Sequence, residues 1–308
     1  MRFVVFGAGG VGGYFGGRLA RAGEDVTFIA RGAHREAIQA KGLRLCTPDG
    51  DILIDPAPVT DDVSTLSPPE YLLFAVKLFD TQVVAEACRP IVGPRTAVVS
   101  LQNGVEAVDI LSGVFGPERV LGGTARVAAV ISEPGVITQT GNFAILSFGE
   151  SDGSRSARGL ALEAACRNAG FEACLLDDID VEIWEKFILL AALSGVTSLT
   201  RLPNGPLRET PATRALVEAC ITEAAAVGRA RGVALSDDVV ASSMVQWDGL
   251  PAEMVASMSH DLNAGKPLEL DHLSGALVRL GQSLGVPTPK HAFIHAALQP
   301  FVGGAPPR

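Results

Sequence analysis

The feature that most constrains the fold is a short apolar run followed at once by a glycine pattern. Phe3–Phe6 is apolar, and the next residues, from Gly7 to Gly12, read GAGGVG and fit G-x-G-x-x-G. Between a strand and a helix this pattern is typical of dinucleotide binding: its glycines permit a tight turn, a close approach of pyrophosphate to the backbone, and close helix–strand packing. We expect Gly7, Gly9, Gly10 and Gly12 to form such a site with the free N–H groups of the helix N-terminus. The alternative is a glycine-rich turn that binds nothing.

Short apolar segments recur in the first half of the chain and alternate with helical stretches such as Gly12–Ala22. This alternation indicates an α/β fold with a doubly wound, parallel sheet of Rossmann type. The predicted strands are Arg2–Phe6, Asp25–Ala30, Tyr71–Val76 and Thr96–Leu101, followed by Arg126–Ile131, Val136–Thr140 and Phe143–Phe148. Turn residues at 134–135 and 141–142 separate the last three strands, which we expect to form an antiparallel edge.

The pattern of hydrophobic residues changes after about Asp178. From there on it indicates helices that are separated by loops with proline and glycine. The predicted helices are Ile179–Leu193, Thr210–Arg231, Ser236–Gln246, Ala252–Leu262 and Leu268–Leu284. We therefore predict two domains. Residues 1–176 form a nucleotide-binding Rossmann-type domain, and residues 177–308 form an all-helical domain.

Composition excludes several classes of protein. The chain has 308 residues, 47% of them hydrophobic, which suits two globular domains rather than a disordered chain. A net charge of −9 and 6% aromatic residues argue against a nucleic-acid groove. The longest apolar runs are too short for a membrane span or a signal peptide, and the cysteines are too scattered for a disulfide framework. We expect a cytoplasmic protein.

The end of the second predicted strand indicates which dinucleotide binds. An NAD site usually places an acidic residue there, whereas this strand runs through Ala30 to Arg31. A guanidinium at this position suits a 2′-phosphate, so Arg31, assisted by Arg35, predicts NADP(H). The alternative is that Arg31 is an ordinary solvated loop residue.

Several motifs together resemble one known family, the ketopantoate reductases (2-dehydropantoate 2-reductases). In chain order they are GAGGVG, the arginine after strand two, AVK at 75–77, LQNG at 101–104, EIWEKF at 182–187, PNG at 203–205 and LELDHLSGALVR at 268–279. The match covers nearly the whole chain. It implies NADPH-dependent reduction of ketopantoate to pantoate, a step toward pantothenate and coenzyme A, in a cleft between a Rossmann domain and a helical domain.

Lys186 is the candidate proton donor. It is a charged residue within an otherwise apolar predicted helix, in a chain with few lysines. Burial lowers the pKa of a lysine toward the working range of a general acid, and reduction of a carbonyl needs such a donor at the oxygen. The resemblance places the family's general-acid lysine at Lys186. The alternative is a surface ion pair between Glu182 and Lys186.

The resemblance implies substrate contacts at Glu269 and Ser257. It aligns Glu269 with a glutamate that binds a substrate hydroxyl and helps to orient the lysine, so we predict a catalytic role for it. Glu269 follows Pro267 and is expected in the first turn of a helix, where an acid also stabilises the helix dipole. Ser257 aligns with a serine that contacts the substrate carboxylate; without the resemblance it would be an ordinary helix residue.

Three further candidates follow predicted strands or turns. Asn103 and Lys77 end two strands, and ligands of open α/β sheets bind at the carboxyl ends of strands. The resemblance implies that Asn103 contacts the ribose and nicotinamide region, and we predict that Lys77 contacts cofactor or substrate. Asn204, in a Pro-Asn-Gly turn, is a candidate substrate contact. Asn-Gly is also a common turn dipeptide.

The sequence departs from the family pattern after the lysine. Leu190 and Ser194 stand where well-studied members carry substrate-binding asparagines, and leucine cannot hydrogen-bond a hydroxyl or a carboxylate. The substrate is therefore ketopantoate or another 2-oxo or hydroxy acid, and a non-catalytic NADP-binding sensor is a third possibility. The histidine spacing predicts no metal site. We expect a small-molecule 2-oxo acid as partner, neither nucleic acid nor membrane, and the sequence allows a homodimer.

Overall fold

The computed structural model describes residues 1–305 and confirms the α/β fold class with a helical second half. The chain divides into two compact units. The first comprises Met1–Asn103 and Ala107–Ile179, and the second comprises Gly104–Glu106 and the chain from Asp180 onward. The second unit is thus discontinuous in sequence, because three residues that follow Asn103 belong with the C-terminal helices.

Within the described residues, the first unit is built on a ten-stranded sheet. Its strand order is β4-β3-β9-β8-β7-β6-β1-β2-β5, and β10 pairs with β9. The strands are β1 (Arg2–Phe6), β2 (Asp25–Ile29), β3 (Leu43–Thr47), β4 (Gly50–Ile54), β5 (Val59–Thr60), β6 (Tyr71–Phe74), β7 (Ala97–Ser100), β8 (Val120–Glu133), β9 (Val136–Gly149) and β10 (Glu172–Leu175). Strands β7, β6, β1 and β2 are neighbours and run parallel, so their carboxyl ends share one edge of the sheet.

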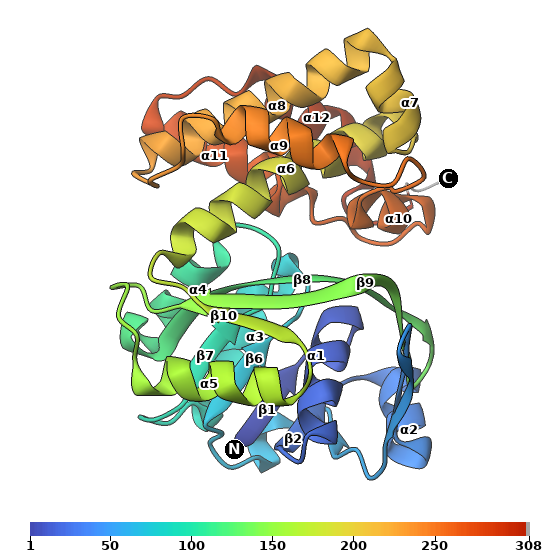
Figure 1. The fold of residues 1–308 in the computed structure, drawn as a ribbon, viewed down its shortest axis with the longest axis vertical. Coiled ribbons are helices and arrows are strands. Elements are labelled where there is room, and N and C mark those ends of the chain that lie inside the picture. The colour runs from blue at the N-terminus through green and yellow to red at the C-terminus, as the bar shows by residue number, and fades with distance from the viewer. Residues whose placement is uncertain (306–308) are drawn as a thin grey trace. The chain divides into compact units, whose positions relative to one another are not determined.

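Helices cover both faces of this sheet, and the alternation along β1 shows why (Figure 1). Phe3 and Val5 pack with residues of α1 (Gly10–Arg21) and α5 (Ala157–Asn168). Val4 and Phe6 point to the opposite face and pack with residues of α3 (Thr81–Cys88) and α4 (Ala107–Phe115). A parallel strand buried on both faces reads as a continuous apolar run, which is the pattern seen in β1.

The predicted antiparallel edge is wrong in two respects. Two long strands, β8 and β9, contain the segments 126–131, 136–140 and 143–148. Because β3 pairs with β9 on its other side, neither β8 nor β9 is an edge strand of the sheet. Gly141 and Asn142 do not form a hairpin turn but lie in β9, where the register shifts between Val127 and Ala129 of the partner strand. Such a bulge inserts extra residues into one strand, so turn-forming residues are tolerated there.

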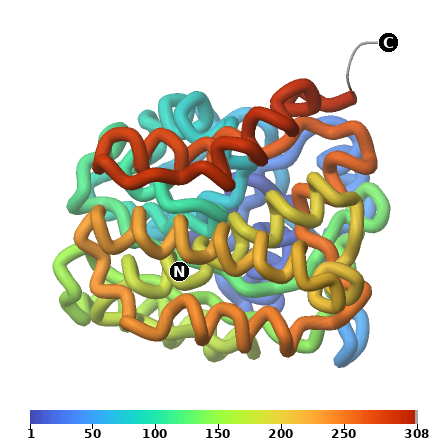
Figure 2. The backbone as a smooth tube through the Cα atoms, turned by 90° about the horizontal axis from the view of Figure 1, so that it is seen from above, coloured from blue at the N-terminus to red at the C-terminus, as the bar shows by residue number. Residues whose placement is uncertain are grey.

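The second unit consists of helices, traced in yellow to red in Figure 2. They are α6 (Ile179–Thr200), α7 (Asn204–Glu209), α8 (Pro211–Ala230), α9 (Val239–Asp248), α10 (Ser257–Asn263), α11 (Ser274–Leu284) and α12 (Pro289–Leu298). Helix α8 contacts α7, α9, α11 and α12 and so forms the centre of the bundle. No helix of residues 1–305 is long and apolar enough to cross a membrane.

Two helix boundaries differ from the predictions in a way that matters for the site. The predicted helix Ala252–Leu262 is helical only from Ser257, in α10. The predicted helix Leu268–Leu284 is divided: a short 3-10 turn, η5 (Leu270–His272), precedes α11. Leu273 lies between them with φ −107° and ψ −95°, outside the helical region, which explains the break.

Candidate functional site

The glycine loop of the first unit is held against the ends of β2 and β6, the two strands that flank β1. The backbone N–H groups of Gly7 and Ala8 both donate to the carbonyl of Ile29, at the end of β2. Gly7 has a φ of +98°, and a Cβ there would lie 2.7 Å from the carbonyl oxygen of Ala75, just beyond β6. Gly7 therefore has to be glycine to make this turn.

No steric contact within the protein requires a glycine at position 9, in contrast to Gly7. A Cβ at Gly9 would meet no atom within 4 Å, whereas one at Gly10 would lie 2.0 Å from the carbonyl oxygen of Ala129. Gly9 is also the N-cap of α1, which has no side-chain cap and no acidic residue in its first turn. Open space beside uncapped N–H groups and a positive helix end fits a dinucleotide phosphate, so the residues present suit this cofactor.

Arg31 lies on the same side of the sheet, two residues past β2. It is exposed, is the N-cap of α2 (Gly32–Lys41), and forms no hydrogen bond or ion pair through its side chain with any residue of 1–305. Arg35 differs, because its guanidinium donates to the carboxylate of Asp61 at 2.7 Å. The structure thus leaves Arg31 available to an anion and engages the expected helper, Arg35, with an acid.

Lys77 and Asn103 follow the adjacent strands β6 and β7, and Gln102 connects these strand ends. The side-chain amide of Gln102 donates to the carbonyl of Val76 at 3.0 Å and to the hydroxyl of Thr81 at 2.8 Å. Gln102 is buried, and its side-chain oxygen has no partner among the described residues. The first unit therefore places the glycine loop, Arg31, Lys77 and Asn103 along one edge, as the sequence predicts for a parallel sheet.

His34 is a positioning residue that the sequence reasoning did not identify. One ring nitrogen, Nδ1, accepts a hydrogen bond from the backbone N–H of Gly135, in the turn between β8 and β9, at 3.0 Å. The other, Nε2, then carries the proton and donates to the carbonyl of Ala8 at 2.8 Å. His34 thus ties the glycine loop to the long hairpin. Its only sequence signal is its place three residues after Arg31.

In the second unit, Lys186 lies partly buried in the first half of the long helix α6. The same helix carries Ser194 and Ser198 further along, and both hydroxyls are buried without a hydrogen-bond partner among the described residues. Buried hydroxyls are normally satisfied, so these two are unusual. Leu190 lies between Lys186 and Ser194 and is partly buried. It offers an apolar side chain at this position of the helix.

Glu269 is buried, with 6% of its surface exposed, and stands at the start of the η5 turn. The expectation that it lies in the first turn of a helix is wrong, because α11 begins only at Ser274. The turn that it begins is anchored through the residues that follow it. His295 bonds the carboxylate of Asp271 at 2.7 Å, and Arg279 donates to the carbonyl of Asp271 at 2.8 Å.

Glu106 adds a further anchor to the same turn from the segment that follows Asn103. Its carboxylate accepts from Arg279 at 2.7 Å and lies 3.8 Å from the ring of His272. Burial would raise the pKa of Glu106, but the nearby His272 ring and the charge and hydrogen bond of Arg279 outweigh it and hold the pKa below its usual value. The turn that begins at Glu269 is therefore fixed by a small ionic cluster.

Ser257 and Asn204 occupy different surroundings in this unit. Ser257 is exposed and begins α10, and this helix is tied to α6 by the hydroxyl of Ser259, which donates to the carbonyl of Thr197 at 3.4 Å. Asn204 begins α7 rather than lying in a turn. Its side-chain oxygen accepts from the buried indole N–H of Trp247 at 3.1 Å. The described contacts of Asn204 are therefore structural, and its substrate contact stays a prediction.

Comparison with known proteins places these features in one family. The model of the family "Ketopantoate reductase PanE/ApbA" matches residues 3–153, and that of its C-terminal domain matches residues 178–301. An uncharacterized oxidoreductase, YkpB, of Bacillus subtilis is 31% identical and covers 98% of this chain and 99% of its own. A 2-dehydropantoate 2-reductase of Mesorhizobium japonicum is 33% identical over 94% of each chain. The crystal structure of a PanE/ApbA family ketopantoate reductase from Ralstonia eutropha superposes with a TM-score of 0.90 at 35% identity, over 98% of each chain.

Proposed function

Because the chain belongs to the ketopantoate reductase family, we propose that it reduces ketopantoate to pantoate with NADPH. The observation that carries this proposal is that the family models match both halves of the chain. The glycine loop and Arg31 lie in the first matched segment, and Lys186 and Glu269 lie in the second. Relatives named 2-dehydropantoate 2-reductase are 23–33% identical, which supports oxidoreductase chemistry on a 2-oxo acid and leaves the substrate to be tested.

Arg31 supports NADP(H) over NAD(H). Its guanidinium is exposed and without a partner among residues 1–305, and no acidic residue occupies the end of β2 to bind a ribose hydroxyl. Arg31→Ala should weaken NADPH binding by about tenfold or more and leave NADH binding nearly unchanged. Arg21→Ala, at an exposed position of α1 in the same unit, is the matched control. Tighter binding of NADH than of NADPH by the unmodified protein would refute the assignment.

The glycine loop offers a second test of cofactor binding. Gly9→Ala meets no protein atom, so it should leave stability unchanged while the added methyl group blocks the pyrophosphate and weakens cofactor binding. Gly113→Ala in α4 also meets nothing within 4 Å and serves as the control for the same change. Equal cofactor affinity in the two variants, measured by titration, would contradict the role of Gly9.

When bound, the cofactor supplies the hydride that adds to the carbonyl carbon of the substrate. We assign to Lys186 the transfer of a proton to the oxygen that becomes the hydroxyl. Glu269 holds the substrate hydroxyl and orients the ammonium group of Lys186, and Ser257 binds the substrate carboxylate. Asn103 and Lys77, at the ends of their strands, position the cofactor. These roles rest on the family resemblance and on the placement of each residue within its own unit.

Leu190 favours a second candidate substrate. Where relatives are expected to present an amide, this chain presents an apolar side chain, followed by the buried, unpartnered hydroxyl of Ser194. A site that has lost a hydrogen-bonding group discriminates less well in favour of a polar substrate. A 2-oxo acid with an apolar side chain is therefore the alternative to ketopantoate.

The decisive experiment follows NADPH oxidation with ketopantoate, benzoylformate and a branched-chain 2-oxo acid. The proposal predicts the highest kcat/KM for ketopantoate, whereas a higher value for either apolar acid would select the alternative. Lys186→Ala should lower kcat by about a hundredfold or more, and Lys290→Ala, exposed in the same unit, should not. Tight NADPH binding without turnover of any acid would instead identify a cofactor sensor.

A further inference from the structure

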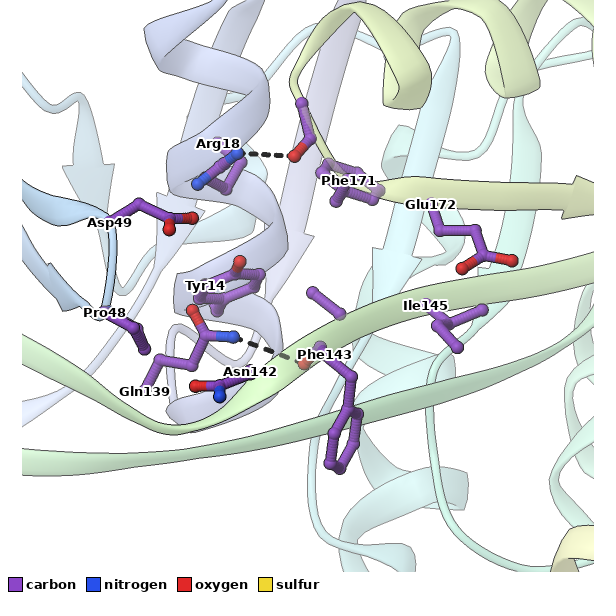
Figure 3. Close-up of a pocket in the computed structure, with 12 residues that line it drawn as sticks. Tyr14, Arg18, Pro48, Asp49, Gln139, Asn142, Phe143, Ile145, Phe171 and Glu172 are labelled. Atoms are coloured by element: carbon purple, nitrogen blue, oxygen red, sulfur yellow. Dashed lines mark hydrogen bonds between the residues drawn. The ribbon is translucent and has the colours of Figure 1, made fainter.

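A pocket of the first unit lies on residues that the proposed reaction does not use (Figure 3). Its volume is about 580 Å³, which lies within the usual range for a small-molecule site. It is formed by the middle of α1, the turn between β3 and β4, the bulged part of β9, and the segment that leads into β10. Its lining residues are Tyr14, Arg18, Pro48, Asp49, Gln139, Asn142–Ile145 and Gly170–Glu172.

Tyr14 is the most informative residue of this pocket. Only 3% of the side chain is exposed, yet its hydroxyl hydrogen-bonds to no residue of 1–305. Figure 3 shows the ring projecting from α1 among the other lining side chains. Burial raises the pKa of Tyr14, so the hydroxyl stays protonated and able to donate. Buried phenol groups usually find a partner, and here the partner has to come from the pocket.

Arg18, one turn further along α1, places a positive charge beside this hydroxyl. Its Nε and one terminal nitrogen donate to the carbonyls of Ala169 and Gly170, at 3.1 and 2.5 Å, which fixes the guanidinium. The guanidinium carbon lies 5.9 Å from the centre of the Tyr14 ring. A guanidinium has five N–H donors, so Arg18 retains donors for a ligand.

Two carboxylates balance this cation. Asp49 and Glu172 are exposed, line the pocket from different elements, and form no hydrogen bond or ion pair with any described residue. Figure 3 shows Asp49 on the side of Arg18 and Tyr14, and Glu172 across the pocket from them. The negative charge of Asp49 acts on Tyr14, which places these two groups near each other. The pocket therefore presents both signs of charge without pairing them.

We propose that this pocket binds an amino acid with a large apolar side chain, as its zwitterion. The ligand carboxylate pairs with Arg18 and accepts from the Tyr14 hydroxyl, and the ligand ammonium group pairs with Asp49 or Glu172. A simple anion would face two carboxylates, and a simple cation would face Arg18 and leave Tyr14 without an acceptor. Phe171 and Ile145 supply apolar contact for the side chain.

The bulge in β9 shapes this pocket, so the irregularity of the strand contributes to a binding site. The Gln139 side chain crosses the bulge and donates to the carbonyl of Phe143 at 3.2 Å, and both residues line the pocket. Bulges commonly re-aim side chains beside binding sites. The pocket also differs from the nucleotide site, because it involves the middle of α1, whereas the phosphate would be held at the N-terminus of this helix, by Gly9 and Gly10.

The two tyrosines of the chain, Tyr14 and Tyr71, make a direct test possible. With ring-¹³C-labelled tyrosine, the full-length protein gives two sets of NMR ring signals, and the Tyr14→Phe variant assigns them. L-phenylalanine should shift the Tyr14 signals saturably, with a dissociation constant of about 1 mM, and leave those of Tyr71 in place. Tyr71 is a built-in control, because its hydroxyl already donates to the carbonyl of Arg158.

Two matched ligands test the charge requirement. Phenethylamine lacks the carboxylate and 3-phenylpropanoate lacks the ammonium group, so each should bind at least about tenfold more weakly than L-phenylalanine. Equal binding of either one would overturn the zwitterion assignment. Absence of any shift of the Tyr14 signals with all three ligands would overturn the site itself.

Two variants test the protein side of the pocket by calorimetric titration. Tyr14→Phe removes only an unpartnered hydroxyl, so the protein should fold and bind L-phenylalanine about tenfold more weakly. Asp49→Asn combined with Glu172→Gln removes both candidate partners of the ammonium group and should weaken binding, whereas Glu36→Gln in α2, also exposed in this unit, should not. Unchanged affinity in both Tyr14→Phe and the Asp49→Asn, Glu172→Gln double variant would show that the amino acid binds elsewhere and would refute the proposal.

Discussion

His291 in α12 makes the stability of the helical unit depend on pH. Its ring is fully buried, with Nε2 donating to the carbonyl of Cys220 at 3.1 Å and Nδ1 accepting from the hydroxyl of Ser274 at 3.3 Å. Burial lowers the pKa of His291 to about 4, against an ordinary value of 6.5, although the bond to the Cys220 carbonyl acts in the opposite direction. The folded unit therefore contains a neutral imidazole over most of the acid range.

The sign of the effect follows from the two pKa values. Between pH 6.5 and about pH 4 the unfolded chain protonates His291 and the folded chain does not, so acid favours the unfolded state. Over this range the free energy of unfolding falls as the pH is lowered. From about pH 7.5 to about pH 5 the contribution of this single group is a loss of about 2 kcal/mol, approaching about 3 kcal/mol below pH 4.

Urea unfolding at these two pH values measures the effect. Trp184 and Trp247 both lie in the second unit, so tryptophan fluorescence reports on the unit that contains His291. The unmodified protein should lose about 2 kcal/mol more than His291→Gln between the two pH values. His260→Gln, which alters an exposed histidine of the same unit, should behave like the unmodified protein. The same pH dependence in His291→Gln and in the unmodified protein would refute the reasoning.

Two other buried polar contacts lead to further predictions. Asn204→Ala removes the partner of the Trp247 indole N–H, so urea unfolding of the helical unit should show a loss of about 2 kcal/mol; a loss of substrate affinity without this destabilisation would contradict the structural role. Burial raises the pKa of Glu150, but the hydrogen bonds from Arg158 and Ser156 outweigh it and lower the pKa overall. This contribution to stability is present above the ordinary glutamate pKa and lost as the pH falls through the lowered one. The melting temperature of the unmodified protein should therefore fall more steeply in acid than that of Glu150→Gln, and parallel curves would exclude Glu150 as the source.

The sequence predicts the parts of the fold that depend on local pattern. Arg2–Phe6 is a strand with the predicted bounds, because a fully apolar run before a glycine turn has few other structures open to it. The pairing in the middle of the sheet was not predictable in this way. Gly141 and Asn142 have turn propensity, and only the cross-strand partners in β8 decide that they form a bulge instead. Which residues of two paired strands lie opposite each other leaves no local signal of this kind.

The candidate site likewise contains residues that the sequence predicts and residues that it does not. The first unit brings together Gly9, Arg31, Lys77 and Asn103 because motif spacing and strand ends are visible in a sequence. His34 is not visible in this way, because its importance comes from a bond to Gly135, a hundred positions away in the chain. The start of α11 was misplaced for a related reason, since long-range contacts to the turn after Glu269 interrupt the helix pattern.

The discontinuous second unit has a consequence for anyone who recombines parts of such proteins. A chimaera joined once, near residue 179, would take the C-terminal helices from one parent and the segment Gly104–Glu106 from the other. The Glu106 carboxylate would then face foreign residues in place of Arg279 and His272, and the turn after Glu269 would lose part of its anchoring. The transferable module is therefore the C-terminal helices together with a three-residue insert from the other half, and a graft should carry both pieces.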